Sequence, residues 1–543
     1  MLWLQSALAQ EFELHPTNVV PQTADQIAMC AAGELIRAEL APIDIGAAHG
    51  FGAGGNWFVG GLLFHAIAPG CIVEKNSHTV AMNSWSWRTS ITPRTRLLLM
   101  VALASLLVQQ ALLWWIYYHA GAKQLVGDEQ QYLAAARAVL AGGAWHPSHI
   151  WPPGQSLLIA SMQGLFGSMI VPMQLLQTAL FLACGGLLWR LWRRLGGSRL
   201  AAAIAAGLFL LNPGDAAYAH YLWPEIPHLF CMLLTLNLLL RDPQKDAVAR
   251  PHLALFAGLS LGLALIFKSL LAAFWPLLLI CFVECWRPLR LQWKSAATFL
   301  LGIFLITAPA LIAGHRNTGH WSIADSSVFN LVAGLSDRAR NDYVDEPVAN
   351  LFGDYLNSGT TADQRNAWAY QQLEKRLQDT PPLELFEQQF ARQYFRLFES
   401  KTLLLTQLPG PTCAGYMSAY HDTPPAAVFA LRWSSHLLHA LILVGFAFGL
   451  CLWREWRYMW LWLLLASVGY QLALYSGLHV KARYLLPMIP VFCCFAGEAY
   501  ARIFQRDARL AITPMRLLAA SLLAVTLLFL AFAGPWIDGY CRG

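Results

Sequence analysis

Acidic residues near the ends of apolar runs are the residues of this sequence best suited to chemistry. Asp128 and Glu129 begin a stretch with the apolar periodicity of a helix lying on a membrane surface, and Glu225 stands at the start of a later apolar run. Neighbouring helix residues point about 100° apart, so Asp128 and Glu129 cannot both face one substrate. One of them contacts substrate at most, and the other supports it or faces a metal. A carboxylate in such a position can accept a proton from a reacting hydroxyl.

Both acidic positions also have ordinary structural explanations. Asp128 could be a helix N-cap, with Gln131 completing a capping box. Glu225 would be stabilised at a helix N-terminus by roughly 0.3–1 kcal/mol. Spacing alone leaves these explanations open.

Positively charged residues are expected at the same depth as the acids. They are Lys268, Arg316 and Arg483, and His220 lies just before Glu225. Snorkelling of helix-end Lys and Arg accounts for most such residues in membrane proteins. Together with the carboxylates, however, these cations could hold a phosphate while a proton is removed from an acceptor.

The composition places these residues in a membrane protein. The chain has 543 residues, of which 57% are hydrophobic and 13% charged, against about 25% charged in an ordinary globular protein. A soluble enzyme, a disordered chain and a disulfide scaffold are therefore excluded. The net charge of +6 comes without a dense basic stripe, so the sequence does not indicate a nucleic-acid partner. Most of the 11 cysteines lie in apolar runs as small hydrophobes.

Eleven apolar segments are long enough to be membrane-spanning candidates, since a span needs about 20 predominantly apolar residues. They cover 97–118, 172–190, 199–213, 224–240, 253–267, 269–286, 295–313, 430–452, 457–476, 484–501 and 515–534. We divide the almost continuous stretch 253–286 at Lys268, because a charge in mid-membrane costs roughly 2.5–3.5 kcal/mol.

Basic loops predict the orientation of these spans. Cytoplasmic loops carry the excess of Lys and Arg, and with eleven spans the basic loops around residues 190–199, 241–250, 287–294, 454–457 and 502–509 all fall on one side. The acids and cations above then face outward. The apolar segment 153–170 would reverse this pattern as a twelfth span, so we expect it to be an interfacial or re-entrant helix.

We predict four regions along the chain. Residues 1–94 form an N-terminal extension to which we assign no function, and 95–313 a catalytic transmembrane module with an acidic first outer loop at 119–171. Residues 314–429 form an extracytoplasmic helical insertion, followed by C-terminal transmembrane helices at 430–543. The insertion contains two amphipathic helical stretches separated at Pro381-Pro382. It either covers the bundle or frames an acceptor site.

Several motifs, in this order, resemble those of a known group of membrane enzymes. The stretch GDEQQYLAAARAVLAGG is followed by Trp151-Pro152-Pro153-Gly154, and Lys268 stands before a small residue. Later come RNTGHWSIADSSVFNLVAG, from Arg316, and RYLLPMIP, from Arg483. Over about 95–500 the chain resembles the protein O-mannosyltransferase and aminoarabinose transferase group, which are polyprenyl-phosphate-sugar-dependent glycosyltransferases of the multi-spanning C type.

The resemblance implies an all-α polytopic bundle of the GT-C type in a bacterial inner membrane, with a periplasmic active site. Asp128 would be the general base, with Glu225 as the acid of the second outer loop and Glu129 beside the base. Lys268, Arg316 and Arg483 would surround the lipid phosphate. Relatives often place an Arg before the second acid. Here His220 is the nearest match, which is a departure from the pattern.

The implied reaction moves a hexose or pentose from a polyprenyl-phosphate donor to lipid A, another glycan or a protein. It is a single displacement with inversion. A divalent cation assists some relatives, but no ligand spacing in this sequence requires one. The alternative function is a secondary carrier or lipid flippase, which should have ionisable residues near the membrane midplane, where only Lys268 is a candidate. A scaffold without catalysis is a third hypothesis.

Overall fold

The computed structural model describes residues 93–118, 125, 127–143, 150–240, 250–284, 290–336, 346–400, 404–405, 408, 420, 422–453, 459–505 and 513–533. The chain divides into two compact units, Met1–Arg96 and Leu97–Gly543. Nearly all of the predicted N-terminal extension lies outside the described residues. Nearly all of the described residues lie in the second unit.

The prediction of an all-α fold is confirmed. The helices of the membrane region are α4 (Pro93–Tyr118), α7 (Ile170–Arg194), α8 (Arg199–Leu210), α9 (Pro213–Ala217), α10 (Glu225–Leu239), α11 (Pro251–Phe267), α12 (Trp293–Thr318), α19 (Pro425–Leu452), α20 (Met459–Tyr475), α21 (Ile489–Phe504) and α22 (Pro514–Phe532). In the described part of the chain the strands are limited to β1 (Val283–Glu284), which pairs antiparallel with β2 (Arg290–Leu291).

Five helices among the described residues are long and apolar enough to cross a membrane. They are Arg96–Tyr118, Ile170–Arg194, Trp293–Thr318, Pro425–Leu452 and Pro514–Phe532. A sixth candidate joins α8 to the following segment through a bend of 56°, and α10, α11 and the Trp460–Tyr475 part of α20 are shorter apolar helices. The chain is thus a multi-pass membrane protein, and the count of eleven spans remains a prediction.

The expected span 269–286 is not an α-helix, which corrects the sequence analysis. Its residues form two 3-10 segments, η4 (Ser269–Leu271) and η5 (Trp275–Phe282), followed by β1. The backbone at Lys268 is extended, with φ −155° and ψ 116°, and ends α11. Pro276 lacks an amide hydrogen and stands in the first turn of η5, so one uninterrupted α-helix from Ser269 would lose a hydrogen bond here. High apolar content was therefore a poor guide to the type of helix here.

The segment 153–170 contains α6 (Gly154–Phe166), a helix of 13 residues. At 1.5 Å per residue it is about 20 Å long, shorter than the roughly 30 Å hydrocarbon core of a bilayer. It ends at Gly167, whose φ of +70° is the left-handed conformation that stops many helices. By itself α6 is too short to cross, and its interfacial or re-entrant position remains a prediction.

Small residues allow the membrane helices to pack closely, as is common in bilayers. On α12, a Cβ added to Gly302 would lie 2.5 Å from the carbonyl oxygen of Leu255 on α11. Gly497 of α21 meets the backbone of α8 at Ala201 and Ala205 in the same way. Larger side chains at these glycines would force the helix pairs apart.

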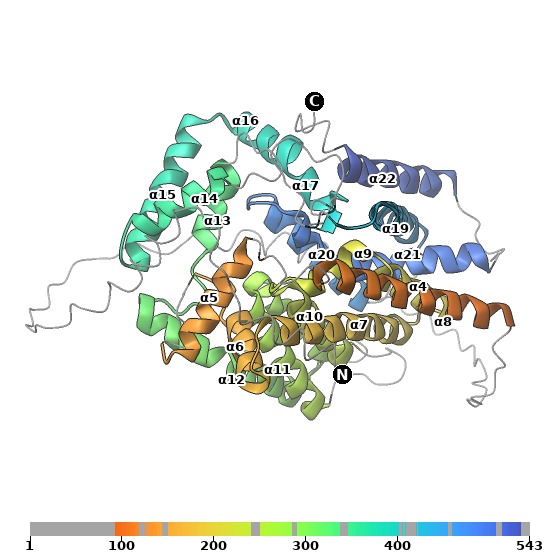
Figure 1. Cartoon of the computed structure of the whole chain (residues 1–543), viewed down its shortest axis with the longest axis horizontal. Helices are drawn as coiled ribbons and strands as arrows, with labels where there is room; N and C mark the ends of the chain where they lie inside the picture. Colours follow the sequence, from red (N-terminus) through yellow and green to blue (C-terminus); the bar gives the residue numbers. More distant parts are fainter. Residues whose placement is uncertain are drawn as a thin grey trace, which may run out of the picture. The chain divides into compact units, whose positions relative to one another are not determined.

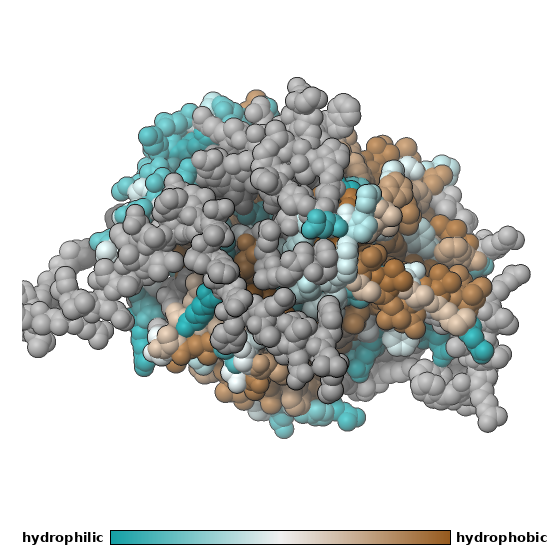
Figure 2. Space-filling model, in the orientation of Figure 1, coloured by the Kyte–Doolittle hydropathy of each residue, from teal (hydrophilic) through white to brown (hydrophobic). Residues whose placement is uncertain are grey.

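Apolar side chains on the outside of the unit mark the surfaces suited to lipid. Figure 2 shows hydrophobic atoms gathered over α4 and α22 and hydrophilic atoms over α15. Leu98 on α4 and Val525 on α22 are among the exposed apolar residues. Contiguous exposed apolar surface of this kind is unusual on a soluble protein but normal on a lipid-facing helix.

The described residues of the 314–429 insertion are largely helical, and its extracytoplasmic place remains a prediction. It contains α13 (Ser327–Ser336), α14 (Glu346–Asn357), α15 (Ala362–Asp379), α16 (Pro382–Glu387), the π-helical segment η6 (Gln388–Gln393) and α17 (Phe395–Phe398). A capping box between Thr361 and Gln364 starts α15, and the break at Pro381-Pro382 lies where the sequence places it. Figure 1 shows α13 to α16 grouped apart from α7 and α8, which pack against each other.

The insertion has a small hydrophobic core of its own. Phe329, Val332 and Ala333 of α13 pack with Tyr355 of α14 and Ala369 of α15. This core holds the three helices together independently of the larger core in the membrane region. The insertion can therefore present α13 to the rest of the unit as one preformed element.

Candidate active site

Four of the residues predicted from the sequence come together in space. Arg483 Nη2 donates a hydrogen bond to Asp128 Oδ2 at 2.5 Å, and Arg483 Nε lies 3.6 Å from Glu225 Oε1. Lys268 Nζ lies 3.4 Å from the same Glu225 oxygen. We call Asp128, Glu225, Lys268 and Arg483 the charged cluster.

Both acids of the cluster are the first residues of their helices. Asp128 begins α5 (Asp128–Leu140), after Gly127 with φ +55°, and Glu225 begins α10. The partial positive charge of a helix N-terminus favours a carboxylate at each place. The capping-box interpretation of Asp128 is wrong, because Gly127 is the N-cap residue and Gln131 Oε1 instead accepts a hydrogen bond from Trp151 Nε1 at 2.8 Å.

The two cations lie where helices are interrupted. Lys268 follows α11, and Arg483 lies in the 3-10 segment η7 (Ala482–Leu485) between α20 and α21. A helix break lets a polar side chain and its backbone turn toward a site without leaving an amide buried and unpaired inside an apolar helix. The sequence signal was a charge placed between long apolar runs.

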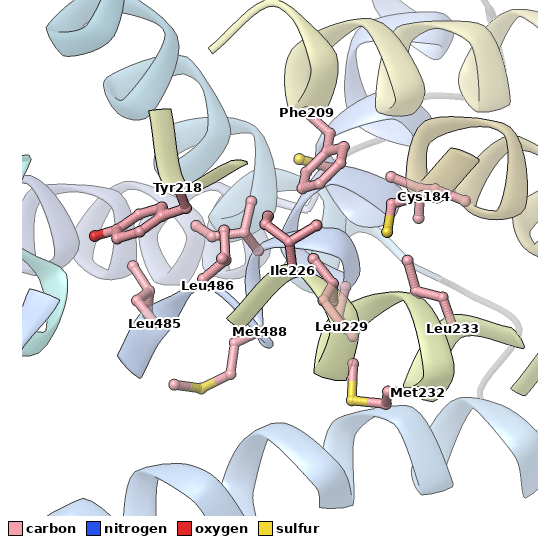
Figure 3. Packing of buried hydrophobic residues seen from close by; sticks show 14 of the residues in the cluster. Cys184, Phe209, Tyr218, Ile226, Leu229, Met232, Leu233, Leu485, Leu486 and Met488 are labelled. Carbon is pink, nitrogen blue, oxygen red and sulfur yellow. The ribbon is translucent and has the colours of Figure 1, made fainter. Parts of the chain in front are cut away.

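Apolar packing anchors the segments that carry Glu225 and Arg483. Figure 3 shows Ile226 and Leu229 of α10 in the same core as Leu485, Leu486 and Met488. All five are at most 3% exposed. The residues that follow Glu225 and Arg483 pack in one hydrophobic core, which holds the two charged residues at fixed positions relative to each other.

Aromatic rings line the charged cluster, and sequence reasoning missed them. The guanidinium of Arg483 lies 4.6 Å from the ring centroid of Trp223 and 5.5 Å from that of Tyr484. Lys268 Nζ lies 4.6 Å from the Tyr484 ring, which stacks on Tyr475 at 5.1 Å. Each cation is thus held by a cation–π contact as well as by a carboxylate. The adjacency of Trp223 to Glu225 and of Tyr484 to Arg483 was the available signal.

The cluster is only partly open to solvent. The side chains of Asp128, Lys268 and Arg483 are 25%, 18% and 13% exposed, whereas that of Glu225 is 3% exposed. Burial alone would lower the pKa of Arg483, but the carboxylates of Asp128 and Glu225 raise it well above its ordinary value. The guanidinium therefore stays charged, and its present partners are two anions that another anion could replace.

Glu129 has different surroundings from Asp128. Its side chain is buried, and Oε1 accepts a hydrogen bond from the backbone amide of Leu222 at 2.7 Å. This contact ties the start of α5 to the segment that leads into Glu225. We propose that Glu129 positions the two loops rather than contacting substrate.

His220 and Arg316 are not brought to the charged cluster by the described contacts. His220 is buried, stacks on Tyr117 at 4.8 Å and meets Trp114 edge-on at 5.1 Å. Arg316 is exposed in the last turn of α12. A phosphate-binding role for either residue stays a prediction, and the site proposed below is built on the charged cluster.

The described residues include no group of three or more His, Cys, Asp or Glu side chains arranged to hold a metal ion. Cys281 and Cys285 are four residues apart in the sequence; Cys281 lies in η5, and Cys285 lies outside the described residues.

The fold and the site define a class: a multi-pass, all-α membrane protein with a cluster of carboxylates and cations at helix ends. Residues 136–324 match the family model of the dolichyl-phosphate-mannose-protein mannosyltransferases. This match confirms the resemblance predicted from the sequence. It includes Glu225 and Lys268, while Asp128 and Arg483 lie outside it.

Several solved structures are similar to this chain, and two of them are described here. One is the archaeal oligosaccharyltransferase AglB from Archaeoglobus fulgidus, in complex with an inhibitory peptide and a dolichol-phosphate, with 12% identity and a TM-score of 0.40. The alignment covers 81% of this chain, which spans 55% of the AglB chain. The other is ArnT from Cupriavidus metallidurans bound to undecaprenyl phosphate, with 15% identity, a TM-score of 0.32 and coverage of 82% of this chain and 88% of that one. No curated protein matches the sequence.

Proposed function

We propose that this protein is a membrane glycosyltransferase that moves a sugar from a polyprenyl-phosphate donor to an extracytoplasmic acceptor. The observation that carries the proposal is the charged cluster, in which Lys268 and Arg483 face Asp128 and Glu225. The family match over 136–324 supports the same donor class. In a bacterial cell the site would face the periplasm from the inner membrane.

The leaving group explains the two cations. Breaking the bond between the sugar C1 and the phosphate oxygen leaves both electrons on that oxygen, so the lipid departs as a phosphate monoester and needs no proton. Its added negative charge falls where Lys268 and Arg483 can stabilise it. The polyprenyl tail stays in the bilayer, which suits a site built at the ends of membrane helices.

The carboxylates account for the other half of the reaction. A new bond forms between the acceptor oxygen and C1 on the opposite face of the sugar, which gives inversion. Asp128 accepts the proton that this oxygen loses. When the donor phosphate replaces Asp128 as the partner of Arg483, the Asp128 carboxylate becomes available for that proton.

The charged cluster does not determine which sugar or which acceptor the protein uses. A hexose or a pentose fits the donor chemistry, and lipid A, another glycan or a protein fits the acceptor chemistry. Mass spectrometry of envelope lipids, glycans and proteins from cells with and without the gene tests the proposal. We expect the loss of one hexose- or pentose-sized mass, together with loss of the same mass in cells carrying Asp128→Asn.

The carrier or flippase alternative makes the opposite prediction. Purified protein in vesicles would move a labelled solute or lipid across the bilayer and form no glycosylated product. Transport of this kind that survives Asp128→Asn would replace the proposal.

A further inference from the structure

Residues 475–479 form a turn that leads from α20 toward Arg483, and we call it the 475–479 turn. The 314–429 insertion contacts the backbone of this turn directly. Gly334 of α13 packs on this turn: a Cβ added there would lie 2.5 Å from the carbonyl carbon of Leu478 and 2.6 Å from the amide nitrogen of His479. Both neighbours are backbone atoms, which cannot rotate away. The fit therefore depends on glycine at position 334.

Hydrogen bonds from two parts of the insertion reinforce this contact. The amide of His479 donates to the carbonyl oxygen of Asn330 on α13 at 3.3 Å. From η6, Gln389 Nε2 donates to the carbonyl oxygens of Tyr475 and Leu478 at 3.1 and 3.2 Å. Gln389 is 3% exposed, so these bonds are protected from competition with water.

Only three residues separate the 475–479 turn from Arg483 of the charged cluster. Val480 is 1% exposed, Lys481 is extended, and η7 with Arg483 follows at once. At the other end of the turn, the ring of Tyr475 stacks on Tyr484, which also contacts Lys268. A displacement of the turn would therefore move Arg483 and the ring that supports Lys268 together.

We propose that Gly334 and Gln389 are positioning residues for the donor phosphate, acting through Arg483 and Tyr484. The insertion thus sets the geometry of the cation pair. Anything that binds and shifts α13 or η6, such as an acceptor, would change donor binding through the same turn. This inference rests on the proposed function and deepens it.

The first test compares two glycine substitutions in the insertion. Gly334→Ala introduces the Cβ described above, whereas Gly353→Ala on α14 meets no atom within 4 Å. Both place alanine in a helix, where its intrinsic preference is favourable, so loss of helix is not the expected cause of any effect. We expect Gly334→Ala to weaken binding of undecaprenyl phosphate to the purified full-length protein about tenfold, equivalent to about 1.4 kcal/mol. Gly353→Ala should bind like wild type.

A second pair keeps the test independent of how well Gly334→Ala folds. Gln389→Met keeps the length of the side chain but removes both donated hydrogen bonds, and exposed Gln378→Met is its control. We expect Gln389→Met to raise KM for the donor several-fold more than it lowers kcat. The control should change neither.

A thermodynamic cycle distinguishes positioning from general damage. In an Arg483→Ala background, Gly334→Ala and Gln389→Met should weaken undecaprenyl phosphate binding much less than in wild type. Full additivity, or unchanged binding in both single variants, would overturn the positioning role. If the wild-type protein neither binds undecaprenyl phosphate nor transfers sugar, the proposed function itself fails, which is a different result.

Discussion

Arg483 and Asp128 lie 355 residues apart in the sequence and form an ion pair of 2.5 Å at the centre of the charged cluster. The pair joins the turn before α21 to the start of α5. A general base paired with an arginine is a poor proton acceptor, because the cation stabilises its ionised form. We propose that this ion pair exists in the protein without bound donor. The donor phosphate then replaces Asp128 as the partner of Arg483.

Replacing Asp128 by Asn should stop transfer without unfolding the protein. The amide keeps the size of the carboxylate but cannot accept the proton, and general-base catalysis is worth typically 10²–10⁴-fold. We expect kcat in purified protein to fall by about that range, while the variant remains folded with a cooperative unfolding transition. Near-wild-type turnover would remove Asp128 from the mechanism.

Arg483→Lys should be far from neutral. Lysine keeps the charge but loses the planar fork that bonds Asp128 while lying on the Trp223 ring. We expect kcat/KM for the donor to fall by roughly 10–100-fold, that is about 1.4–2.8 kcal/mol. Arg502→Lys is the matched control, because Arg502 pairs with Glu498 on α21 away from the cluster. Equal effects at both positions would argue against a specific role for Arg483.

Tyr484 should act through its ring rather than its hydroxyl. Tyr484→Phe keeps the face that Lys268 approaches at 4.6 Å, whereas Tyr484→Leu removes it. Cation–π contacts are worth about 0.5–2 kcal/mol, so Tyr484→Leu should raise the donor KM by about 2–30-fold. Steady-state kinetics with varied donor would show this, and a loss of activity in Tyr484→Phe as large as in Tyr484→Leu would contradict it.

Glu129 should influence stability more than chemistry. Glu129→Ala leaves the buried Leu222 amide without its acceptor, which costs about 1–3 kcal/mol. Glu129→Gln retains an oxygen in the same place. We expect a lowered unfolding midpoint for the alanine variant and substantial activity for the glutamine variant. A glutamine variant as inactive as Asp128→Asn would return Glu129 to the catalytic residues.

The contact between His320 and the start of α15 should depend on pH. A hydrogen bond of 2.5 Å between His320 Nε2 and Asp363 Oδ1 raises the pKa of the imidazole. The negative charge of Asp363 also raises it. The contact is thus favoured below the ordinary histidine pKa and is lost as pH rises through the raised value. Titration of His320 by NMR should show this pKa above that of the Asp363→Asn variant. Equal pKa values in the two proteins would exclude the pair in solution.

Sequence reasoning reached the four charged residues because each stands at the end of an apolar run and within a motif of the resembled group. Spacing alone could not separate Asp128 from Glu129, because their different contacts are with Arg483 and Leu222, which are distant in sequence. Sequence reasoning could not predict the 3-10 geometry within 269–286, since apolar content does not distinguish an α-helix from 3-10 turns. The contact between Gly334 and the 475–479 turn joins backbone segments that are distant in sequence, so no local sequence pattern predicts it.

The most direct test of the central claim is the affinity of the purified protein for undecaprenyl phosphate, measured in wild type, Asp128→Asn and Arg483→Ala. If the lipid phosphate replaces Asp128 on Arg483, the asparagine variant should bind at least as tightly as wild type, because the competing carboxylate is gone. The Arg483→Ala variant should bind at least about tenfold more weakly. Binding that is unchanged in Arg483→Ala, or that is lost in Asp128→Asn, would contradict the account.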